Sequence, residues 1–256
     1  MSTCVCIRGL EFTYESQRDV HFKLPKCAEE GMGRQRAIIV ETLTISRGEL
    51  VIFCGANGAG KSTLLSILGG RKMVQKGVVN IFGRNCFDDC QLSSVVCYVG
   101  ERWSDRFLDL TIAQFLGEEV LSKDRCKALC DILSIDLNWR ISRLSEGQRR
   151  RCQIVSTFTS SEDLSVYILD ETTADLDIVS RERLLSWLKT QARDSGATIL
   201  YATHIFDGLN EWGSRLIFLE NGIISHDITV DQSTNLYALV KQWMMVSQPT
   251  LAHESQ

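Results

Sequence analysis

The stretch that most constrains the fold runs from residue 50 to residue 63, where LVIFC is followed by GANGAGK and then by ST. The apolar run is typical of a buried strand, and the glycines after it let the backbone take a positive φ and approach a ligand closely. Because several N–H groups then converge at a helix start, the stretch predicts a phosphate-binding loop. The residues expected to hold a nucleotide here are Gly55, Ala56, Asn57, Gly58, Ala59, Gly60, Lys61, Ser62 and Thr63.

Two side chains of this loop have defined expected roles. Lys61 is expected to reach the β- and γ-phosphates of a nucleoside triphosphate. The hydroxyl of Ser62 is expected to face Mg²⁺, an ion that prefers oxygen ligands. A glycine-rich turn without a ligand is the alternative, and the strand and helix that flank the loop argue against it.

Composition limits the class of protein. With 256 residues, of which 44% are hydrophobic and 23% charged, the chain can form one α/β domain or a domain with a subdomain. A formal net charge of -4 gives no general attraction to nucleic acid, so no direct nucleic-acid binding is expected. No apolar run reaches the ~18 to 20 residues of a membrane helix, and no signal peptide is evident. Ten cysteines without a secretion signal predict reduced thiols of a cytosolic protein.

Alternating patterns predict strands and helices along the rest of the chain. Strands are expected over 5–14, 37–45, 49–54, 78–82, 95–99, 164–169, 198–203, 215–219 and 223–226, and helices after residue 61 and over 110–121, 124–133, 180–189 and 236–245. Polar composition with proline and glycines predicts a surface insertion over 15–36. The helical block predicts a subdomain over about 104–160, and a C-terminal helix and tail are expected over 230–256.

Several side chains outside the loop are candidates for function. Tyr14 ends the first strand and is either a core aromatic or a ring that stacks on adenine. Asp170 and Glu171 follow a fully apolar strand, at the edge where α/β sheets gather function, although surface acids are the alternative. Ser145 is a good N-cap with Gln148 placed for a capping box. The arginines at 149–151 are interpreted as a solvated helix face.

The order of these motifs is informative. The phosphate loop, the helical block, LSEGQ at 144–148, LDE at 169–171 and TH at 203–204 together resemble the nucleotide-binding domain of the ABC ATPases. The resemblance covers the chain from residue 14 to about residue 222. It implies one domain over 1–256 with an α/β fold: a P-loop NTPase of ABC type with a RecA-like core, an N-terminal antiparallel β-subdomain and an inserted α-helical subdomain. It also implies an ATPase that binds Mg-ATP in a head-to-tail homodimer and hydrolyses it to ADP and phosphate.

The resemblance further implies which residues cross the dimer interface. Ser145, Gly147 and Gln148 would bind the γ-phosphate held by the opposite subunit, through N–H groups at the positive end of a helix. Asp177 would lie in the loop at the dimer seam.

Within one subunit, the resemblance implies the catalytic and metal-binding groups. Asp170 would hold Mg²⁺ through water, and Glu171 would polarise the attacking water as general base. His204 would contact the γ-phosphate. The family commonly has glutamine where this chain has Glu101, which could still ligate Mg²⁺ but adds negative charge near the phosphates. The alternative is that Glu101 is a surface acid and hydrolysis is slow.

Two short segments narrow the resemblance. YVGERW at 98–103 and LVKQWM at 239–244 look like the small soluble eukaryotic ABC ATPases known as accessory factors of the CCR-NOT transcription and mRNA-decay assembly. This implies a cytoplasmic or nuclear regulator in a soluble complex. Two alternatives from other classes are the ATPase subunit of a membrane transporter and a nucleotide-dependent scaffold that barely hydrolyses ATP. The presence of both Glu171 and His204 argues against the scaffold.

Overall fold

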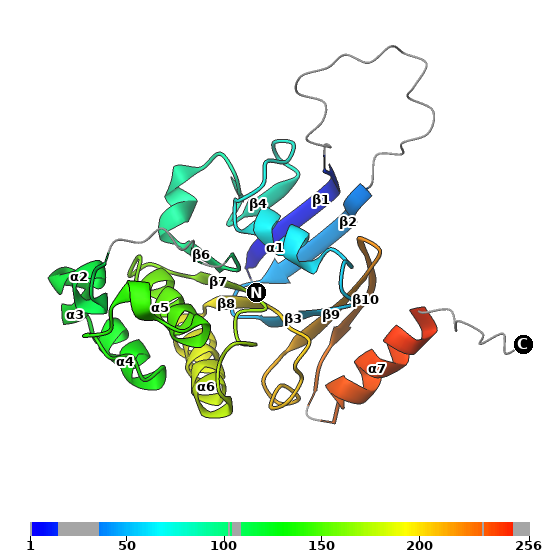
Figure 1. The fold of residues 1–256 in the computed structure, drawn as a ribbon. Helices are drawn as coiled ribbons and strands as arrows, with labels where there is room; N and C mark the ends of the chain where they lie inside the picture. Colours follow the sequence, from blue (N-terminus) through cyan, green and yellow to red (C-terminus); the bar gives the residue numbers. More distant parts are fainter. Residues whose placement is uncertain (1, 15–35, 102, 104–108, 232, 248–256) are drawn as a thin grey trace, which may run out of the picture.

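The described residues of this computed structural model form one ten-stranded mixed sheet, in the order β5-β4-β1-β2-β10-β9-β3-β8-β7-β6 (Figure 1). The description covers the chain except residues 1, 15–35, 102, 104–108, 232 and 248–256. The expected surface insertion therefore lies almost entirely outside the described residues. The strands are β1 (Thr3–Thr13), β2 (Arg36–Ser46), β3 (Leu50–Cys54), β4 (Val79–Ile81), β5 (Arg84–Asn85), β6 (Val96–Val99), β7 (Val166–Asp170), β8 (Thr198–Ala202), β9 (Arg215–Glu220) and β10 (Ile223–Thr229).

Pairing divides the sheet into two parts. The strands β6, β7, β8, β3 and β9 pair parallel with one another in that order, as expected where helices cover both faces of a sheet. The strand β10 pairs antiparallel with β9 and parallel with β2, so it joins this part to the rest of the sheet. The strands β5, β4, β1 and β2 pair antiparallel at the other end. The parallel strand β3 leads directly into the phosphate loop.

Seven α-helices pack around the sheet in the described part of the chain (Figure 1). The helix α1 begins directly after the phosphate loop. The helices α2 to α5 form the helical block at one end of the sheet. None of these helices combines the length and the apolar composition that a membrane span requires. Their bounds are α1 (Lys61–Leu68), α2 (Ile112–Leu116), α3 (Glu118–Ser122), α4 (Asp124–Ile132), α5 (Glu146–Phe158), α6 (Ile178–Ser195) and α7 (Leu236–Ser247).

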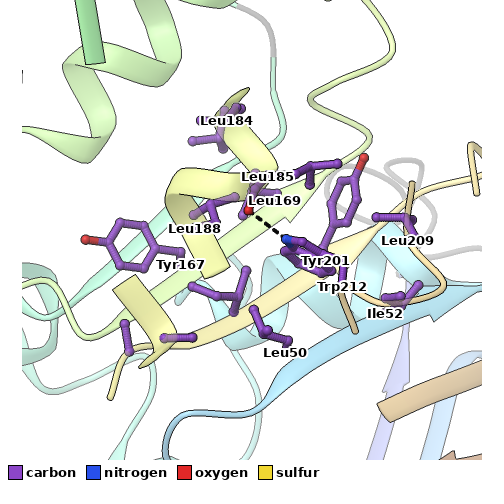
Figure 2. Packing of buried hydrophobic residues seen from close by; sticks show 14 of the residues in the cluster. Leu50, Ile52, Tyr167, Leu169, Leu184, Leu185, Leu188, Tyr201, Leu209 and Trp212 are labelled. Atoms are coloured by element: carbon purple, nitrogen blue, oxygen red, sulfur yellow. Dashed lines mark hydrogen bonds between the residues drawn. The ribbon is translucent and has the colours of Figure 1, made fainter. Parts of the chain in front are cut away.

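Successive side chains of a strand point to opposite faces of the sheet, so the continuous apolar strands have apolar side chains on both faces. Each face packs in its own core cluster. In β3, Leu50 and Ile52 enter a core cluster shared with α4, α5, α6 and α7, whereas Val51 and Phe53 enter a second cluster shared with α1. Figure 2 shows the first cluster, in which the indole Nε1 of Trp212 donates a hydrogen bond of 2.7 Å to the carbonyl of Leu185. Both faces of β3, the strand that leads into the phosphate loop, are therefore packed against helices.

The predicted helix over 110–121 is wrong, because the structure has two short helices there. The backbone of Gly117 has φ 79° and ψ 156°, outside the helical region, so α2 ends at Leu116 and α3 begins at Glu118. The crossover helix α6 is longer than the predicted 180–189 and ends where Gly196 takes a left-handed conformation.

The predicted C-terminal helix is confirmed, and it packs on the strands β9 and β10. Leu236 and Val240 are fully buried in the first core cluster. The ring of Trp243 stacks on His226, with centroids 4.2 Å apart, and lies 5.4 Å from the ring of Phe218. The helix α7 is therefore an integral part of the fold.

Candidate active site

The phosphate loop takes the conformation that the glycines predict. Gly55 has φ 144°, and a Cβ atom there would lie 2.2 Å from the carbonyl oxygen of Leu219, so only glycine fits. Gly60 is left-handed and stands directly before α1, whose first residue is Lys61. The ammonium of Lys61 folds back over the loop and donates to the carbonyls of Gly55 at 2.9 Å and Ala56 at 3.1 Å.

The end of β7 brings a carboxylate to the first turn of α1. The hydroxyl of Ser62 donates a hydrogen bond of 3.0 Å to Oδ1 of Asp170, and the phenol of Tyr98 donates one of 3.3 Å to Oδ2. Burial raises the pKa of the Asp170 carboxyl, and these two hydrogen bonds act in the opposite direction. A hydroxyl and a carboxylate at this distance are oxygen ligands of the kind Mg²⁺ prefers, so the two residues fit that ion.

Glu171 lies between two basic side chains. Its Oε1 is 3.9 Å from the ammonium of Lys61 and 3.8 Å from Nδ1 of His204. Its backbone has φ 50°, a conformation that non-glycine residues rarely adopt and that clusters at functional sites. The structure therefore brings together the three residues predicted to be catalytic, beside the pair Ser62 and Asp170.

A cavity of about 260 Å³ opens at these carboxylates. Its described lining residues are Ser62, Gly100, Arg150, Asp170, Glu171, Ala174 and Asp175. Glu101, which follows Gly100 in the chain, is not among them. Glu101 is exposed, and its main-chain carbonyl accepts a hydrogen bond from Gln153. Metal binding by Glu101 stays a prediction.

Tyr14 contacts the first turn of α1, the helix that follows the loop. It is 50% exposed, so its interpretation as a core aromatic is wrong. Its hydroxyl is hydrogen-bonded to that of Thr63 at 2.8 Å, and the ammonium of Lys72 lies 4.8 Å from its ring centroid. The ring of Phe12 lies nearly perpendicular to the ring of Tyr14, with centroids 5.2 Å apart. Stacking on adenine stays a prediction for this ring.

The predicted capping box at the start of α5 is confirmed. Ser145 Oγ accepts from the N–H of Gln148 at 3.3 Å, and Gln148 Oε1 accepts from the N–H of Ser145 at 3.0 Å. Gly147 packs closely on the next loop, because a Cβ there would lie 3.0 Å from the carbonyl oxygen of Asp175. These motif residues do not line the described cavity of their own chain.

Asp177 caps the helix α6. Its carboxylate accepts from the N–H of Ser180 at 2.9 Å and from the hydroxyl of Ser180 at 2.8 Å, and these bonds lower its pKa. Arg151 contributes a more distant charge, 3.9 Å away. A role of Asp177 in nucleotide binding stays a prediction.

Two residues of the site were missed by sequence reasoning. Arg150 is only 6% exposed and lines the cavity, so its interpretation as part of a solvated face is wrong. A run of arginines gives no signal that one of them points inward. Tyr98 was assigned to a strand, and alternation along the strand could not show that its hydroxyl reaches Asp170.

Comparisons with known proteins agree with this geometry. The family model described as "ABC transporter" matches residues 41–174. The chain is 33% identical over 261 residues to "ABC transporter I family member 20" of Arabidopsis thaliana, covering 95% of this chain and 76% of that protein. It is 32% identical over 205 residues to "CCR4-associated factor 16" of Saccharomyces cerevisiae, covering 73% of this chain and 70% of that protein.

A solved structure shows the same fold. The dimeric structure of an ATP-binding cassette in a post-hydrolysis state, bound to ADP and Pi, superposes with a TM-score of 0.70 at 21% identity. The match covers 89% of this chain and 99% of that chain. The chain therefore belongs to the ABC transporter family and has the ABC-type P-loop NTPase fold with a mixed sheet. It is an ABC-type ATPase that binds and hydrolyses ATP.

Proposed function

We propose that this ATPase works as a head-to-tail homodimer that holds two Mg-ATP molecules at its interface, and that its cycle regulates a soluble transcription and mRNA-decay assembly of the CCR-NOT kind. The observation that carries the proposal is the grouping of Lys61, Glu171 and His204 beside the hydrogen-bonded pair Ser62 and Asp170. This grouping supports the proposal because phosphoryl transfer uses a cation on the phosphates, oxygen ligands for Mg²⁺ and a group that orients the attacking water.

Each of these residues has a role in the proposed reaction. Lys61 exchanges its hydrogen bonds with the loop carbonyls for the β- and γ-phosphates, at the N-terminus of α1. Ser62 and Asp170 would hold Mg²⁺, which supplies positive charge against the phosphate oxygens. Glu171 orients the attacking water and accepts its proton, while His204, whose Nδ1 lies 3.8 Å from Glu171 Oε1, contacts the γ-phosphate.

Two surface features support the dimer. Ser145 and Gln148 cap the start of α5, and the positive end of this 13-residue helix can bind a phosphate that a second subunit presents. Directly after Asp177, Ile178 is 76% and Val179 54% exposed, so two large apolar residues face solvent in this chain. Contact with a second copy would cover them, as apolar patches at interfaces are covered.

Two observations support the proposal of a regulatory client. The segments 98–103 and 239–244 resemble the soluble eukaryotic group, and one relative of similar sequence bears the name "CCR4-associated factor 16". A cytoplasmic or nuclear location follows from the same argument. The description of the matching family as "ABC transporter" favours a second candidate, the ATPase subunit of a membrane transporter.

Dimer formation is tested with Glu171→Gln, which keeps the side-chain shape but removes the general base. With ATP and Mg²⁺ we expect this variant to elute as a stable dimer in size-exclusion chromatography with light scattering, while wild type returns to monomer after hydrolysis. A Glu171→Gln, Lys61→Ala double variant is the matched control, because it should bind ATP poorly and stay monomeric. A Glu171→Gln protein that remains monomeric with saturating ATP would refute the homodimer.

The client is tested by affinity purification from the protein's own cells, followed by mass spectrometry. Glu171→Gln and wild type are compared, since an ATP-locked dimer should retain an ATP-dependent partner. Enrichment of soluble RNA-decay or transcription factors supports the regulatory role. A multispanning membrane protein as the main partner would instead establish the transporter subunit.

A further inference from the structure

Two side chains of α5 hold the main chain that follows β6. Both terminal nitrogens of Arg150 donate to the carbonyl of Gly100, at 3.2 Å each, and Gln153 Nε2 donates to the carbonyl of Glu101. The two side chains also bond to one another, because Arg150 Nη1 donates to Gln153 Oε1 at 2.9 Å. Residues three apart lie on one face of a helix, so the pair forms one unit.

The same guanidinium reaches a second loop. Its Nε lies 3.7 Å from Oδ2 of Asp175, in the loop that begins at Glu171. The first turn of α5 packs on that loop as well, since a Cβ added at Gly147 would lie 3.0 Å from the carbonyl oxygen of Asp175. Arg150 therefore joins the helix to both loops.

Both loops border the cavity at the catalytic carboxylates. Gly100 lies in its wall from one loop and Asp175 from the other, together with Asp170 and Glu171. Arg150 is the one cation among the seven described residues that line this cavity. Burying an arginine costs free energy unless its charge is paired and its N–H groups are hydrogen-bonded. Here the guanidinium is bonded to Gly100 and paired with Asp175, both of which line the cavity.

We propose that Arg150 and Gln153 are positioning residues for ATP hydrolysis. They hold the Gly100–Glu101 segment and the Asp175 loop against α5, so that the Ser145–Gln148 motif and the two walls of the cavity move as one unit. A phosphate bound at the start of α5 then acts on the position of Glu171 through the Arg150–Gln153 pair. This inference deepens the proposed function and rests on it for the source of that phosphate.

The first test measures hydrogen–deuterium exchange of the nucleotide-free protein. In Arg150→Gln we expect the amides of residues 96–101 to exchange about tenfold faster, because charge-assisted hydrogen bonds to the Gly100 carbonyl are lost. Exchange in β3 and α6 should be unchanged. Arg150→Lys keeps the charge without the planar fork, so it should resemble Arg150→Gln. Unchanged exchange over 96–101 in both variants would overturn the proposal.

The second test separates ATP binding from hydrolysis. For Arg150→Gln we expect the dissociation constant of a fluorescent ATP analogue to change by less than about threefold, while single-turnover hydrolysis slows by about tenfold or more. Arg183→Gln, which neutralises an exposed arginine of α6, is the matched control and should behave as wild type. Faster exchange over 96–101 with undiminished hydrolysis would show that the pair is only structural.

A second variant protects the test against misfolding. Gln153→Met keeps the length of the side chain but removes the donor to the Glu101 carbonyl, and it should show the same two effects more weakly. The exchange experiment uses no nucleotide, so its result stands whether or not the homodimer forms. Wild type that hydrolyses ATP as a monomer would refute the homodimer alone, whereas wild-type exchange and hydrolysis in Gln153→Met would refute the positioning role.

Discussion

The phenol of Tyr98 donates a hydrogen bond of 3.3 Å to Oδ2 of Asp170, so both oxygens of that carboxylate are held, the other by Ser62. Two glycines leave room for the ring. A Cβ at Gly69 would lie 2.9 Å from ring and Cβ atoms of Tyr98, and one at Gly100 would lie 2.2 Å from its hydroxyl. The orientation of the proposed Mg²⁺ ligand is thus set by β6 as well as by α1.

Removing that hydroxyl should change the magnesium requirement. In Tyr98→Phe, Asp170 loses one donor to its charged form, so its pKa should rise further and its orientation should relax. We expect the Mg²⁺ concentration for half-maximal ATP hydrolysis to rise about five- to tenfold. Binding of ATP without Mg²⁺ should be unaffected and serves as the control. An unchanged magnesium requirement would show that Ser62 alone orients the carboxylate.

The buried charge of Asp170 should cost stability at neutral pH. Burial raises its pKa above the ordinary value of 3.8. The folded protein therefore holds this proton more strongly than the unfolded chain does, and the folded state loses stability as the pH rises through the raised pKa. Asp170→Asn removes the charge, and the amide can still bond to Ser62 and Tyr98.

At neutral pH we expect Asp170→Asn to raise the thermal midpoint of the nucleotide-free protein by about 2 to 4 °C, while abolishing hydrolysis. The gain should shrink as the pH is lowered through the raised pKa toward 3.8. Calorimetry across this pH range makes the measurement, with wild type at each pH as the reference. A lower midpoint at neutral pH would mean that the carboxylate is stabilised, not strained, by its surroundings.

How far the sequence predicted the molecule depends on how local each signal is. The strands β3, β7 and β8 were found because continuous apolar runs reflect burial on both faces. Both Ser62 and Asp170 were predicted to hold Mg²⁺, Ser62 from the phosphate-loop pattern and Asp170 from the resemblance to the ABC ATPases, and the structure joins their side chains by a hydrogen bond of 3.0 Å. The break at Gly117 was missed because apolar spacing continues across it.

Long-range contacts were harder to predict. Arg150 lies among three arginines, and only the packing of α5 on the segment after β6 decides that one of them is buried. The conformation of Glu171, with positive φ, has no sequence signal at all. Such features arise from tertiary structure and become visible only when the elements are placed together.

The buried cysteines should resist alkylation. Burial raises the pKa of Cys54 to about 12 and also raises that of Cys97, so little thiolate is present at pH 8. Cys90 is exposed. With iodoacetamide we expect Cys90 to react first among the described cysteines, and Cys54 and Cys97 to react only after denaturation. Peptide mass spectrometry measures each site.

The Cys90→Ser variant is the control for this labelling experiment, because it removes the expected fast site and leaves the core unchanged. Fast labelling of Cys54, which directly precedes the phosphate loop, would show that β3 opens in the native protein. Such a result would contradict the complete burial of that strand in the core.

The exposed ring of Tyr14 should matter for nucleotide affinity and little for stability. Tyr14→Ala removes the predicted stacking surface for adenine, which is worth about 1 to 3 kcal/mol, so the dissociation constant for ATP should rise about five- to 150-fold. Because the side chain is half exposed, the thermal midpoint should change little. Tyr14→Phe keeps the ring but loses the hydrogen bond to Thr63, and it should bind ATP within about threefold of wild type. Equal weakening in Tyr14→Phe and Tyr14→Ala would place the effect in that hydrogen bond, and unchanged affinity in Tyr14→Ala would exclude stacking on this ring.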